Sequence, residues 1–393
     1  MITKAIEAAL REFSSFKLLR QKLIADIDKN SIKLLAIGKS APIMSQAATA
    51  AFSAANIAYE GYLLTKYSAA LPPIPNVICY EAGHPLPDEN SLLYSRKIMD
   101  WLQSLAIDDT LIILLSGGGS ALFELLEEGI TLSEVIAMNR ELLFSGKSIA
   151  EMNRIRSRFS QLKGGKALSR IPCNRVFCYA LSDVEDNDPQ VIASGAFFNN
   201  SFACIGKDKY EFMDKAANKH YLYRIIGDNN SFCKILAQRV MEPVTVHDTF
   251  LAKNTCAVAE YLADFVQNNP DTGVHIWGGE APVQVTGKGI GGRCTHLALE
   301  VAIRISGMEN VSFAAYATDG NDNIAGIAGA IVDGQSVSCM LKMGINPHQY
   351  LQNCDSYNAL KAINALILGC NYAANVNDVC IIYKQGIDAS LQG

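Results

Sequence analysis

The sequence lacks the features that mark membrane, nucleic-acid-binding and disulfide-rich proteins. No apolar run approaches the ~18 residues that a membrane-spanning helix needs. The formal net charge is −5, so there is no basic surplus for nucleic-acid phosphates. The 11 cysteines contain no Cys-x-x-Cys pair, and the 6 histidines are scattered singly. This pattern argues against a disulfide framework or a structural zinc site. We therefore expect a cytoplasmic protein with reduced cysteines and no nucleic-acid or membrane partner.

Signals of targeting and of linkers between domains are also missing. Residues 1–13, MITKAIEAALREF, place apolar side chains at helical spacing and lack the apolar core of a signal peptide. No Gly/Ser linker, low-complexity tract or short repeat stands out. The 393 residues, 49% of them hydrophobic and 19% charged, are enough for two domains with large cores.

Strand-like apolar runs alternate with helical patterns in the first part of the chain. This βαβα order predicts an α/β fold with a mostly parallel sheet and helices on both faces. We expect strands within 32–38, 62–66, 76–88, 110–115 and 175–188, and helices within 39–55 and 89–105.

A second α/β set begins after about residue 240. We expect helices within 254–269 and 296–306, and strands within 273–280, 281–287, 311–320 and 377–385. The boundary is placed near residues 235–250, which gives domains 1–240 and 250–393.

The segment TLIILLSGGGSALFELLEEG, residues 110–129, contains a turn with almost no side chains. The apolar run before the turn predicts a strand buried on both faces, and the leucines after it have helical spacing. Backbone N–H groups at such a helix start can bind an anion, although an ordinary tight turn has the same pattern. The candidate anion-binding residues are Ser116, Gly117, Gly118, Gly119 and Ser120.

Ligands of open parallel sheets bind at the carboxyl ends of the strands. Turn chemistry can explain any one polar strand end, but six such ends together favour a ligand site. His84 is more simply a hydrogen-bonded loop residue than a catalytic base. The strand ends are 38–40, 83–85, 116–120, 182–183, 278–280 and 318–320.

Three glycine motifs do not meet the requirements of nucleotide-binding fingerprints. Segments 37–40 (IGKS) and 145–148 (SGKS) lack the earlier glycine of a P-loop, because Lys33 and Glu141 occupy that position. Segment 287–292 (GKGIGG) is not followed by the βαβ unit and acidic residue of a dinucleotide site. We therefore do not expect NAD binding.

Cations and carboxylates remain on the glycine-rich loops. Lys39 lies between a strand and a helix, and Arg293 follows three glycines within five residues. Asp183, Asp319 and Glu280 each follow a predicted strand. Singly, each could be a solvated surface charge. Together they supply what phosphoryl transfer needs, namely cations for phosphate oxygens and carboxylates for Mg²⁺.

At these residues the sequence resembles the glycerate 2-kinases whose C-terminal domain is called MOFRL. The resemblance runs over nearly the whole length in eight ordered blocks. The blocks are AIGKSAPIM, GHPLPDEN, LLSGGGSALF, LLFSGKSIAEMNRIRSRFSQLKGGKAL, LSDVEDNDPQVIASG, WGGEAPVQVTGKGIGGR, ATDGNDNIAGIAGAIVD and NVND.

The resemblance implies a Rossmann-like N-terminal α/β domain and a smaller α/β MOFRL domain, with a cleft between them. It implies transfer of the γ-phosphate of ATP, with Mg²⁺, to the 2-hydroxyl of D-glycerate, which gives 2-phosphoglycerate. The partners would be this small-molecule substrate and ATP, with a homodimer left open.

The family's functional residues map onto this sequence one by one. Lys39 and Arg293 take the positions regarded as catalytic. Asn153 and Arg156 match an N-x-V-R segment that would contact the substrate, beside residues 116–120. The acids of the S-D-V and T-D-G motifs fall on Asp183 and Asp319. With Glu280, they are the candidates for holding Mg²⁺ or orienting the hydroxyl.

Several C-terminal motifs depart from the family pattern. These departures leave open a catalytically inactive relative that binds a nucleotide or metabolite. A hydroxypyruvate reductase is a further alternative, but it needs a nicotinamide site that the sequence does not show. The residues that depart are Cys294, Thr295, His296, Asn323, Tyr372, Ala373 and Ala374.

Overall fold

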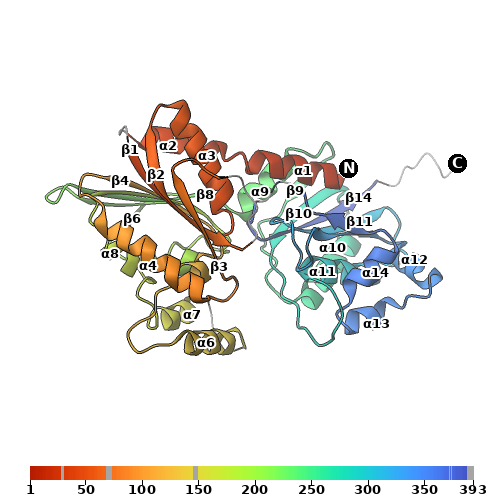
Figure 1. The fold of residues 1–393 in the computed structure, drawn as a ribbon. Coiled ribbons are helices and arrows are strands. Elements are labelled where there is room, and N and C mark those ends of the chain that lie inside the picture. The colour runs from red at the N-terminus through yellow and green to blue at the C-terminus, as the bar shows by residue number, and fades with distance from the viewer. Residues whose placement is uncertain (28–30, 68–72, 145–148, 371, 373, 387–393) are drawn as a thin grey trace. The chain divides into compact units, whose positions relative to one another are not determined.

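The computed structural model describes residues 1–27, 31–67, 73–144, 149–370, 372 and 374–386 (Figure 1). Segment 145–148 and Ala373 therefore lie outside the described residues. The chain forms two compact units. We call residues 15–228 the N-terminal unit, and residues 1–14 together with 229–393 the C-terminal unit. Each unit is described by itself.

Helix α1 (Ile2–Phe13) belongs to the C-terminal unit although it begins the chain. It packs on α9 (Asn229–Ala237), where the rings of Phe13 and Phe232 meet edge to face with centroids 5.7 Å apart. An ion pair between Glu12 and Arg239 adds to this contact. The amphipathic pattern predicted the buried face of α1, but it could not show which part of the chain covers that face.

Within the described residues, the N-terminal unit contains an eight-stranded sheet of order β3-β2-β1-β4-β5-β8-β7-β6. The first six strands in this order are parallel, and β7 and β6 are antiparallel additions. The prediction of a mostly parallel sheet is therefore confirmed. The strands are β1 (Ser31–Ile37), β2 (Ala58–Lys66), β3 (Val77–Ala82), β4 (Thr110–Leu115), β5 (Arg175–Leu181), β6 (Ala203–Gly206), β7 (Lys209–Asp214) and β8 (Lys219–Gly227).

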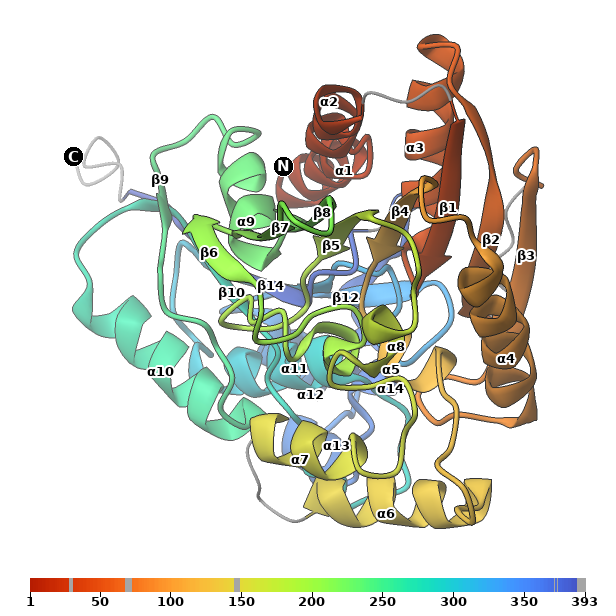
Figure 2. The ribbon, with the colours of Figure 1, turned by 90° about the vertical axis from the view of Figure 1, so that its left-hand side faces the viewer.

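The central parallel strands are buried between two layers of helices. Every residue of β4 is buried, as expected for an apolar run without alternation. Figures 1 and 2 show α2 and α3 on one face of the sheet and α4 and α8 on the other. These helices are α2 (Lys17–Asp26), α3 (Ala41–Ala54), α4 (Glu89–Ser104) and α8 (Lys166–Ser169).

The centre of this sheet is a topological switch point. The chain proceeds outward from β1 to β2 and β3 on one side, and from β4 to β5 on the other. Strands β1 and β4 are parallel neighbours, with Ile37 opposite Leu115. Their following loops therefore lie side by side, in the crevice where open α/β sheets bind ligands.

The helix after the glycine-rich turn is shorter than the leucine spacing predicted. Helix α5 covers only Gly119–Leu122. Leu125 and Leu126 lie in extended chain that pairs with a distant segment. The Gln161 N–H donates to Leu125 O at 2.8 Å, and Leu126 forms an isolated bridge with Ser160. Tertiary pairing therefore replaces the expected continuation of the helix.

Within its described residues, the C-terminal unit contains a six-stranded sheet of order β13-β12-β11-β14-β10-β9. Most neighbours are antiparallel, and only β9 and β10 pair in parallel. The strands are β9 (Val244–Val246), β10 (Gly273–Gly279), β11 (Val311–Ala317), β12 (Ile327–Asp333), β13 (Leu366–Leu368) and β14 (Asp378–Lys384).

The strand expected at 281–287 is absent, because this described segment runs as a loop. Pro282 cannot donate a ladder hydrogen bond. The loop continues to residue 292 and is held by a second loop. The Gly289 N–H donates to Asn353 O at 2.8 Å, and the Ile290 N–H donates to Asp355 Oδ1 at 2.9 Å.

Helices cover both faces of the C-terminal sheet. Figure 1 shows α10 (Thr255–Asn268) and α11 (Arg293–Arg304) on one face and α9 with α1 on the other. The rest of this unit's helices are α12 (Ser336–Lys342), α13 (Pro347–Gln352) and α14 (Ser356–Ala362).

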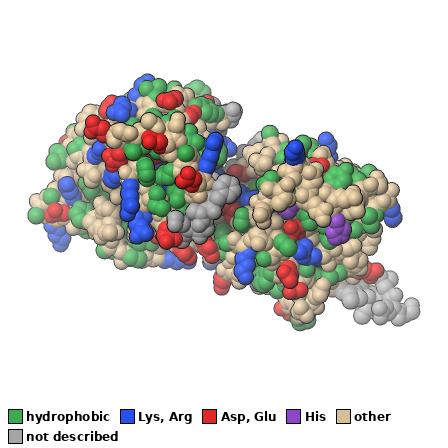
Figure 3. Space-filling model, turned by 90° about the horizontal axis from the view of Figure 1, so that it is seen from below, with side chains coloured by type: hydrophobic (Ala, Val, Ile, Leu, Met, Phe, Trp, Pro, Cys, Tyr) green, Lys and Arg blue, Asp and Glu red, His purple; other side chains and the backbone are tan. Residues whose placement is uncertain are grey.

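Two properties of the structure concern the membrane-spanning and nucleic-acid-binding classes that the sequence argued against. None of the described helices combines the length and apolar character that crossing a bilayer requires. On the face drawn in Figure 3, basic and acidic side chains are interspersed on each unit. That face therefore offers no concentrated positive field.

Candidate functional site

Lys39 lies in the loop between β1 and α3, at the switch point of the parallel sheet. The loop is fixed to the glycine-rich turn after β4 by three hydrogen bonds. The Lys39 N–H donates to Gly117 O at 2.9 Å, the Ser40 N–H donates to Ser116 Oγ at 3.0 Å, and the Ser116 N–H donates to Ile37 O at 3.0 Å. Ser116 is fully buried, so its hydroxyl holds the two loops together.

The Lys39 side chain is half-buried, and it forms no ion pair with any carboxylate of the described residues. The structure brings Lys39 and the glycine-rich turn together, and their shared role in one site stays a prediction. The turn also brings in His84. A Cβ built on Gly118 would lie 3.0 Å from Lys39 Cγ and 3.0 Å from His84 Cδ2. The glycine therefore leaves room for both side chains.

The candidate substrate residues Asn153 and Arg156 are joined to each other. Arg156 donates from Nη1 to Asn153 Oδ1 at 3.2 Å and from Nε to Asn139 Oδ1 at 2.8 Å. Burial lowers the pKa of the Arg156 guanidinium below its ordinary value. Asn153 and Ser194 both line a cavity of about 360 Å³ in the N-terminal unit, and Ser194 links Asn153 to Ser120.

In the C-terminal unit, one row of residues across the sheet defines a second candidate region. Asp378, the first residue of β14, lies opposite Gly279 of β10 and also opposite Ala317 of β11. Strands β10 and β11 are both antiparallel to β14, so they end at the edge where β14 begins. Glu280 and Asp319 follow these two strand ends, which places both near Asp378.

Arg293, the first residue of α11, is bound by two carboxylates at this edge. Its Nε and Nη2 donate to Asp378 Oδ2 and Oδ1 at 3.1 and 3.2 Å, and its Nη1 lies 2.9 Å from Glu280 Oε1. Burial lowers the pKa of Arg293, but the two carboxylates raise it by more, so it stays charged. The two predicted catalytic cations therefore differ in their partners, because Arg293 is bound to two carboxylates and Lys39 to none among the described residues.

Asp378 carries the most consequential pKa shift of this cluster. The residue is 5% exposed. Burial raises its pKa to about 7, and Arg293 opposes this rise only in part. The negative charges of Glu280 and Asp322 also favour the protonated form. Two carboxylates therefore share one guanidinium, with a third carboxylate nearby, and the raised pKa of Asp378 favours its protonated form below neutral pH.

Asp322 fixes the start of α11 and hence the position of Arg293. Its Oδ1 accepts from the Cys294 N–H at 2.9 Å, and its Oδ2 accepts from the Thr295 N–H at 2.7 Å. Burial raises the pKa of Asp322, while these N–H groups oppose the rise. The second aspartate of the T-D-G-N-D-N segment thus positions a catalytic candidate.

The departures from the family pattern are accommodated locally. Asn323 has φ +58°, a left-handed conformation that asparagine tolerates better than most residues. Cys294 and Thr295 are buried in the unit, and His296 Nε2 lies 3.4 Å from Glu300 Oε1. Ala374 is buried and its N–H donates to Thr318 O at 2.8 Å, while the Arg11 guanidinium lies over the Tyr372 ring.

The three carboxylates predicted for a metal come from two different units. Asp183 follows β5 in the N-terminal unit, whereas Asp319 and Glu280 belong to the C-terminal unit. Among the described residues, no group of three or more His, Cys, Asp or Glu side chains is placed to hold a metal ion. Glu280 is paired with Arg293. Asp319 accepts a hydrogen bond from the Asn321 N–H at 3.0 Å and is half-buried.

This arrangement fits Mg²⁺ only in the mode in which the ion takes most ligands from nucleotide phosphates and water. Magnesium in kinases commonly uses one or two carboxylates in that way. Asp319 suits such a role, and the paired Glu280 suits it less.

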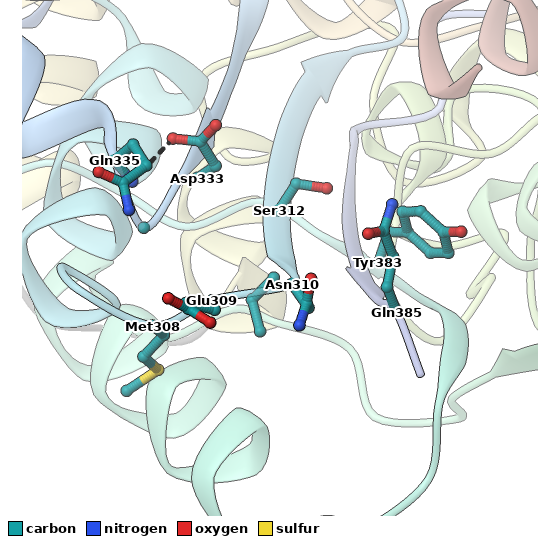
Figure 4. Close-up of a pocket in the computed structure, with 10 residues that line it drawn as sticks. Met308, Glu309, Asn310, Ser312, Asp333, Gln335, Tyr383 and Gln385 are labelled. Carbon is teal, nitrogen blue, oxygen red and sulfur yellow. Dashed lines mark hydrogen bonds between the residues drawn. The ribbon is translucent and has the colours of Figure 1, made fainter. Parts of the chain in front are cut away.

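A separate polar cavity of about 370 Å³ opens in the C-terminal unit (Figure 4). Its walls include Asn310 and Ser312 near the start of β11 and Asp333 at the end of β12. Asp333 Oδ1 accepts the Gln335 N–H at 3.0 Å. Because Asp319 follows the other end of β11, this cavity is not part of the Arg293 edge.

The sequence reasoning missed Asp378, Asp322 and Ser194 as site residues. Each lies inside a block on which the resemblance rests, namely NVND, ATDGNDN and QVIASG. An aspartate at the start of a largely apolar strand was the available signal for Asp378. No local pattern marks Ser194.

Comparisons with known proteins agree with the two-part organisation. Residues 1–218 match a family described as a domain of unknown function, DUF4147, and residues 273–378 match the MOFRL family. A D-glycerate 2-kinase of Thermotoga maritima is 34% identical over 97% of this chain and 96% of its own length. A glycerate 2-kinase of Pyrococcus horikoshii is 29% identical over 90% and 87%.

Solved structures give the same result. The crystal structure of a glycerate kinase from Thermotoga maritima has a TM-score of 0.81 and 31% identity over 98% of both chains. A Pyrococcus horikoshii protein has a TM-score of 0.71 and 26% identity over 98% of this chain and 99% of its own. The chain therefore belongs to the glycerate 2-kinase family, whose C-terminal part is a MOFRL domain.

Proposed function

We propose that this protein transfers the γ-phosphoryl group of ATP to the 2-hydroxyl of D-glycerate and forms 2-phosphoglycerate. Relatives named glycerate 2-kinase, similar over nearly the full chain, support this substrate. The observation that carries the proposal is Lys39. Its backbone N–H is bonded to the glycine-rich turn at the sheet's switch point, its Cγ lies beside Gly118, and its side chain has no carboxylate partner among the described residues.

Lys39 and Arg293 are the proposed catalytic cations. Phosphoryl transfer spreads negative charge over the phosphate oxygens, and fixed cations stabilise that charge. The N–H groups of residues 117–119 are proposed to approach the phosphates. Asp378 and Glu280 hold the guanidinium of Arg293 in a fixed orientation. Asn153 and Arg156 are proposed to contact the substrate.

Asp319 is the residue proposed to hold Mg²⁺, which would neutralise phosphate charge when bound. Asp183, in the other unit, is proposed to orient the reacting hydroxyl. A cytoplasmic location, where the 11 free cysteines would stay reduced, is part of the same proposal.

The test is an assay of ADP formation with ATP, Mg²⁺ and D-glycerate, followed by positional analysis of the phosphorylated product. We expect 2-phosphoglycerate from the wild type. Lys39→Ala and Arg293→Ala should each lower kcat by about 10³-fold or more, the scale of a cation at the transferred phosphoryl group. Lys207→Ala, at an exposed position between β6 and β7, is the matched control and should keep full activity.

Other results would point to the alternatives. No ADP formation, together with thermal stabilisation by ATP, would indicate an inactive binding protein. Oxidation of NADH with hydroxypyruvate would support the provisional name, hydroxypyruvate reductase, of a relative from Agrobacterium vitis that is 29% identical over 88% of this chain. A product phosphorylated at the 3-position would contradict the proposed regiochemistry.

A further inference from the structure

Ser194 occupies a strained turn beside the glycine-rich loop. It is 3% exposed, and Ala193, Ser194 and Gly195 have successive φ values of +48°, +54° and +65°. A left-handed conformation costs a non-glycine residue about 1–2 kcal/mol, so the surrounding structure must hold it. The Gly164 and Gly165 N–H groups do so by donating to Ser194 O at 3.0 Å and Gly195 O at 2.8 Å.

The strained turn places the Ser194 hydroxyl between two candidate site residues. Its Oγ lies 2.7 Å from Ser120 Oγ, in the glycine-rich turn, and 3.2 Å from Asn153 Oδ1, on α7 (Ile149–Arg156). One buried hydroxyl thus connects two segments that the sequence analysis had assigned separately to substrate binding.

The neighbours of Asn153 determine which way its amide points. Arg156 Nη1 can only donate, and it lies 3.2 Å from Asn153 Oδ1. The Val191 carbonyl can only accept, and it lies 3.5 Å from Asn153 Nδ2. Both contacts require the same orientation, with Oδ1 as the acceptor that faces Ser194.

The direction of the whole hydrogen-bond chain follows. Ser194 must give its single hydroxyl hydrogen to Asn153 Oδ1, because that oxygen has none to give. The contact between the two serines then requires Ser120 to donate its hydrogen to Ser194 Oγ. Ser120 is only half-buried. To any ligand that approaches, its oxygen therefore offers lone pairs and no hydrogen.

We propose that Ser120 accepts a hydrogen bond from a hydroxyl group of the acceptor substrate, and that Ser194 is the positioning residue that imposes this role. The inference rests on the proposed function and deepens it. A fully ionised phosphate oxygen has no hydrogen to donate, so Ser120 is a poor partner for it. A small hydroxy acid has hydroxyl donors. Ser120 therefore differs in role from the rest of the turn, where backbone N–H groups face an anion.

The experiment is steady-state kinetics of Ser120→Ala, Ser194→Ala and the double variant, with D-glycerate and ATP varied independently. Loss of one neutral hydrogen bond should raise KM for D-glycerate by about 3- to 10-fold in Ser120→Ala. KM for ATP should change by less than about 2-fold. Ser169→Ala, an exposed serine of α8, is the control and should leave both values unchanged. Thermal unfolding of each variant checks the fold.

Non-additivity tests the link between the two serines. If Ser194 acts through Ser120, Ser194→Ala should raise KM for D-glycerate, and the double variant should resemble Ser120→Ala. The inference is overturned if Ser120→Ala raises KM for ATP while KM for D-glycerate stays constant, or if the two single effects multiply. A wild type that forms no ADP with D-glycerate is a different result, since it removes the proposed function on which the inference rests.

Discussion

Gly118→Ala separates the cost of backbone strain from the cost of disturbing the candidate site. Gly118 has φ +87°, so any side chain there pays the left-handed penalty of about 1–2 kcal/mol. Gly129 has φ +80°, and a Cβ built on it meets no atom within 4 Å. Gly129→Ala therefore pays the same backbone penalty without a new contact, which makes it a matched control.

The added methyl group at position 118 would press on two side chains of the site. It would lie 3.0 Å from Lys39 Cγ, 3.0 Å from His84 Cδ2 and 3.2 Å from His84 Nε2. Such contacts are a few tenths of an ångström too short, so Lys39 and His84 must shift. The flexible lysine can move at little cost in stability. A displaced catalytic group, however, can lower the rate by about 10²-fold when the displacement approaches 1 Å.

We therefore expect Gly118→Ala and Gly129→Ala to lose similar stability, about 1–2 kcal/mol each by urea unfolding. Only Gly118→Ala should lose activity, with kcat for ADP formation falling by about 10- to 100-fold. A Gly118→Ala enzyme with the same kcat as Gly129→Ala would refute the placement of Lys39 at the reacting phosphate. Equal losses of activity in both variants would mean that strain alone explains the effect.

Two further predictions concern buried charges. The pKa of about 7 for Asp378 exceeds the unfolded value of about 3.9, so the folded state binds more protons between these values. Stability from this group is fully present below pH ~4 and is lost as pH rises through 7. Urea unfolding at pH 5 and at pH 8 tests this. From pH 5 to pH 8, the free energy of unfolding should fall more in the wild type than in Asp378→Asn. A smaller fall in the wild type would contradict a raised pKa for Asp378. In the N-terminal unit, Glu124 and Lys163 form an ion pair with exposures of only 1% and 3%. Lys163→Met should cost about 3–5 kcal/mol because it leaves a buried carboxylate unpaired. Glu124→Gln combined with Lys163→Met should cost less, and a single-variant cost below ~1 kcal/mol would show that the pair is not effectively buried.

Local sequence patterns predicted strands β1 to β5 of the N-terminal sheet but not β6, β7 and β8. The apolar runs at β1, β4 and β5 are continuous because both faces of a parallel sheet are covered. The loops that follow β1 and β4, which carry Lys39 and the glycine-rich turn, lie side by side in the structure. This was predictable because the carboxyl ends of parallel strands share one edge.

The C-terminal sheet shows the limit of the same reasoning. The runs at β10, β11 and β14 predicted strands, but an apolar run does not encode whether its neighbour is parallel or antiparallel. The segment after β10 alternates in a strand-like way, yet it forms a loop because residues 353 and 355 bind its backbone. Likewise, α1 was predictable as an amphipathic helix, whereas its partner α9 was not.

The sequence by itself determined the α/β class, the central strands of both sheets, the family and the two cations that lead the functional proposal. Tertiary structure alone decided which groups surround those cations. Arg293 and Asp378 are 85 residues apart in the chain, and Ser120 and Ser194 are 74 apart. Side-chain pairing at such separations depends on the order of the strands within the sheet and on the conformation of the loops that connect them. For that reason the structure, and not the pattern of residues, shows that Lys39 has no carboxylate partner among the described residues while Arg293 is held by two.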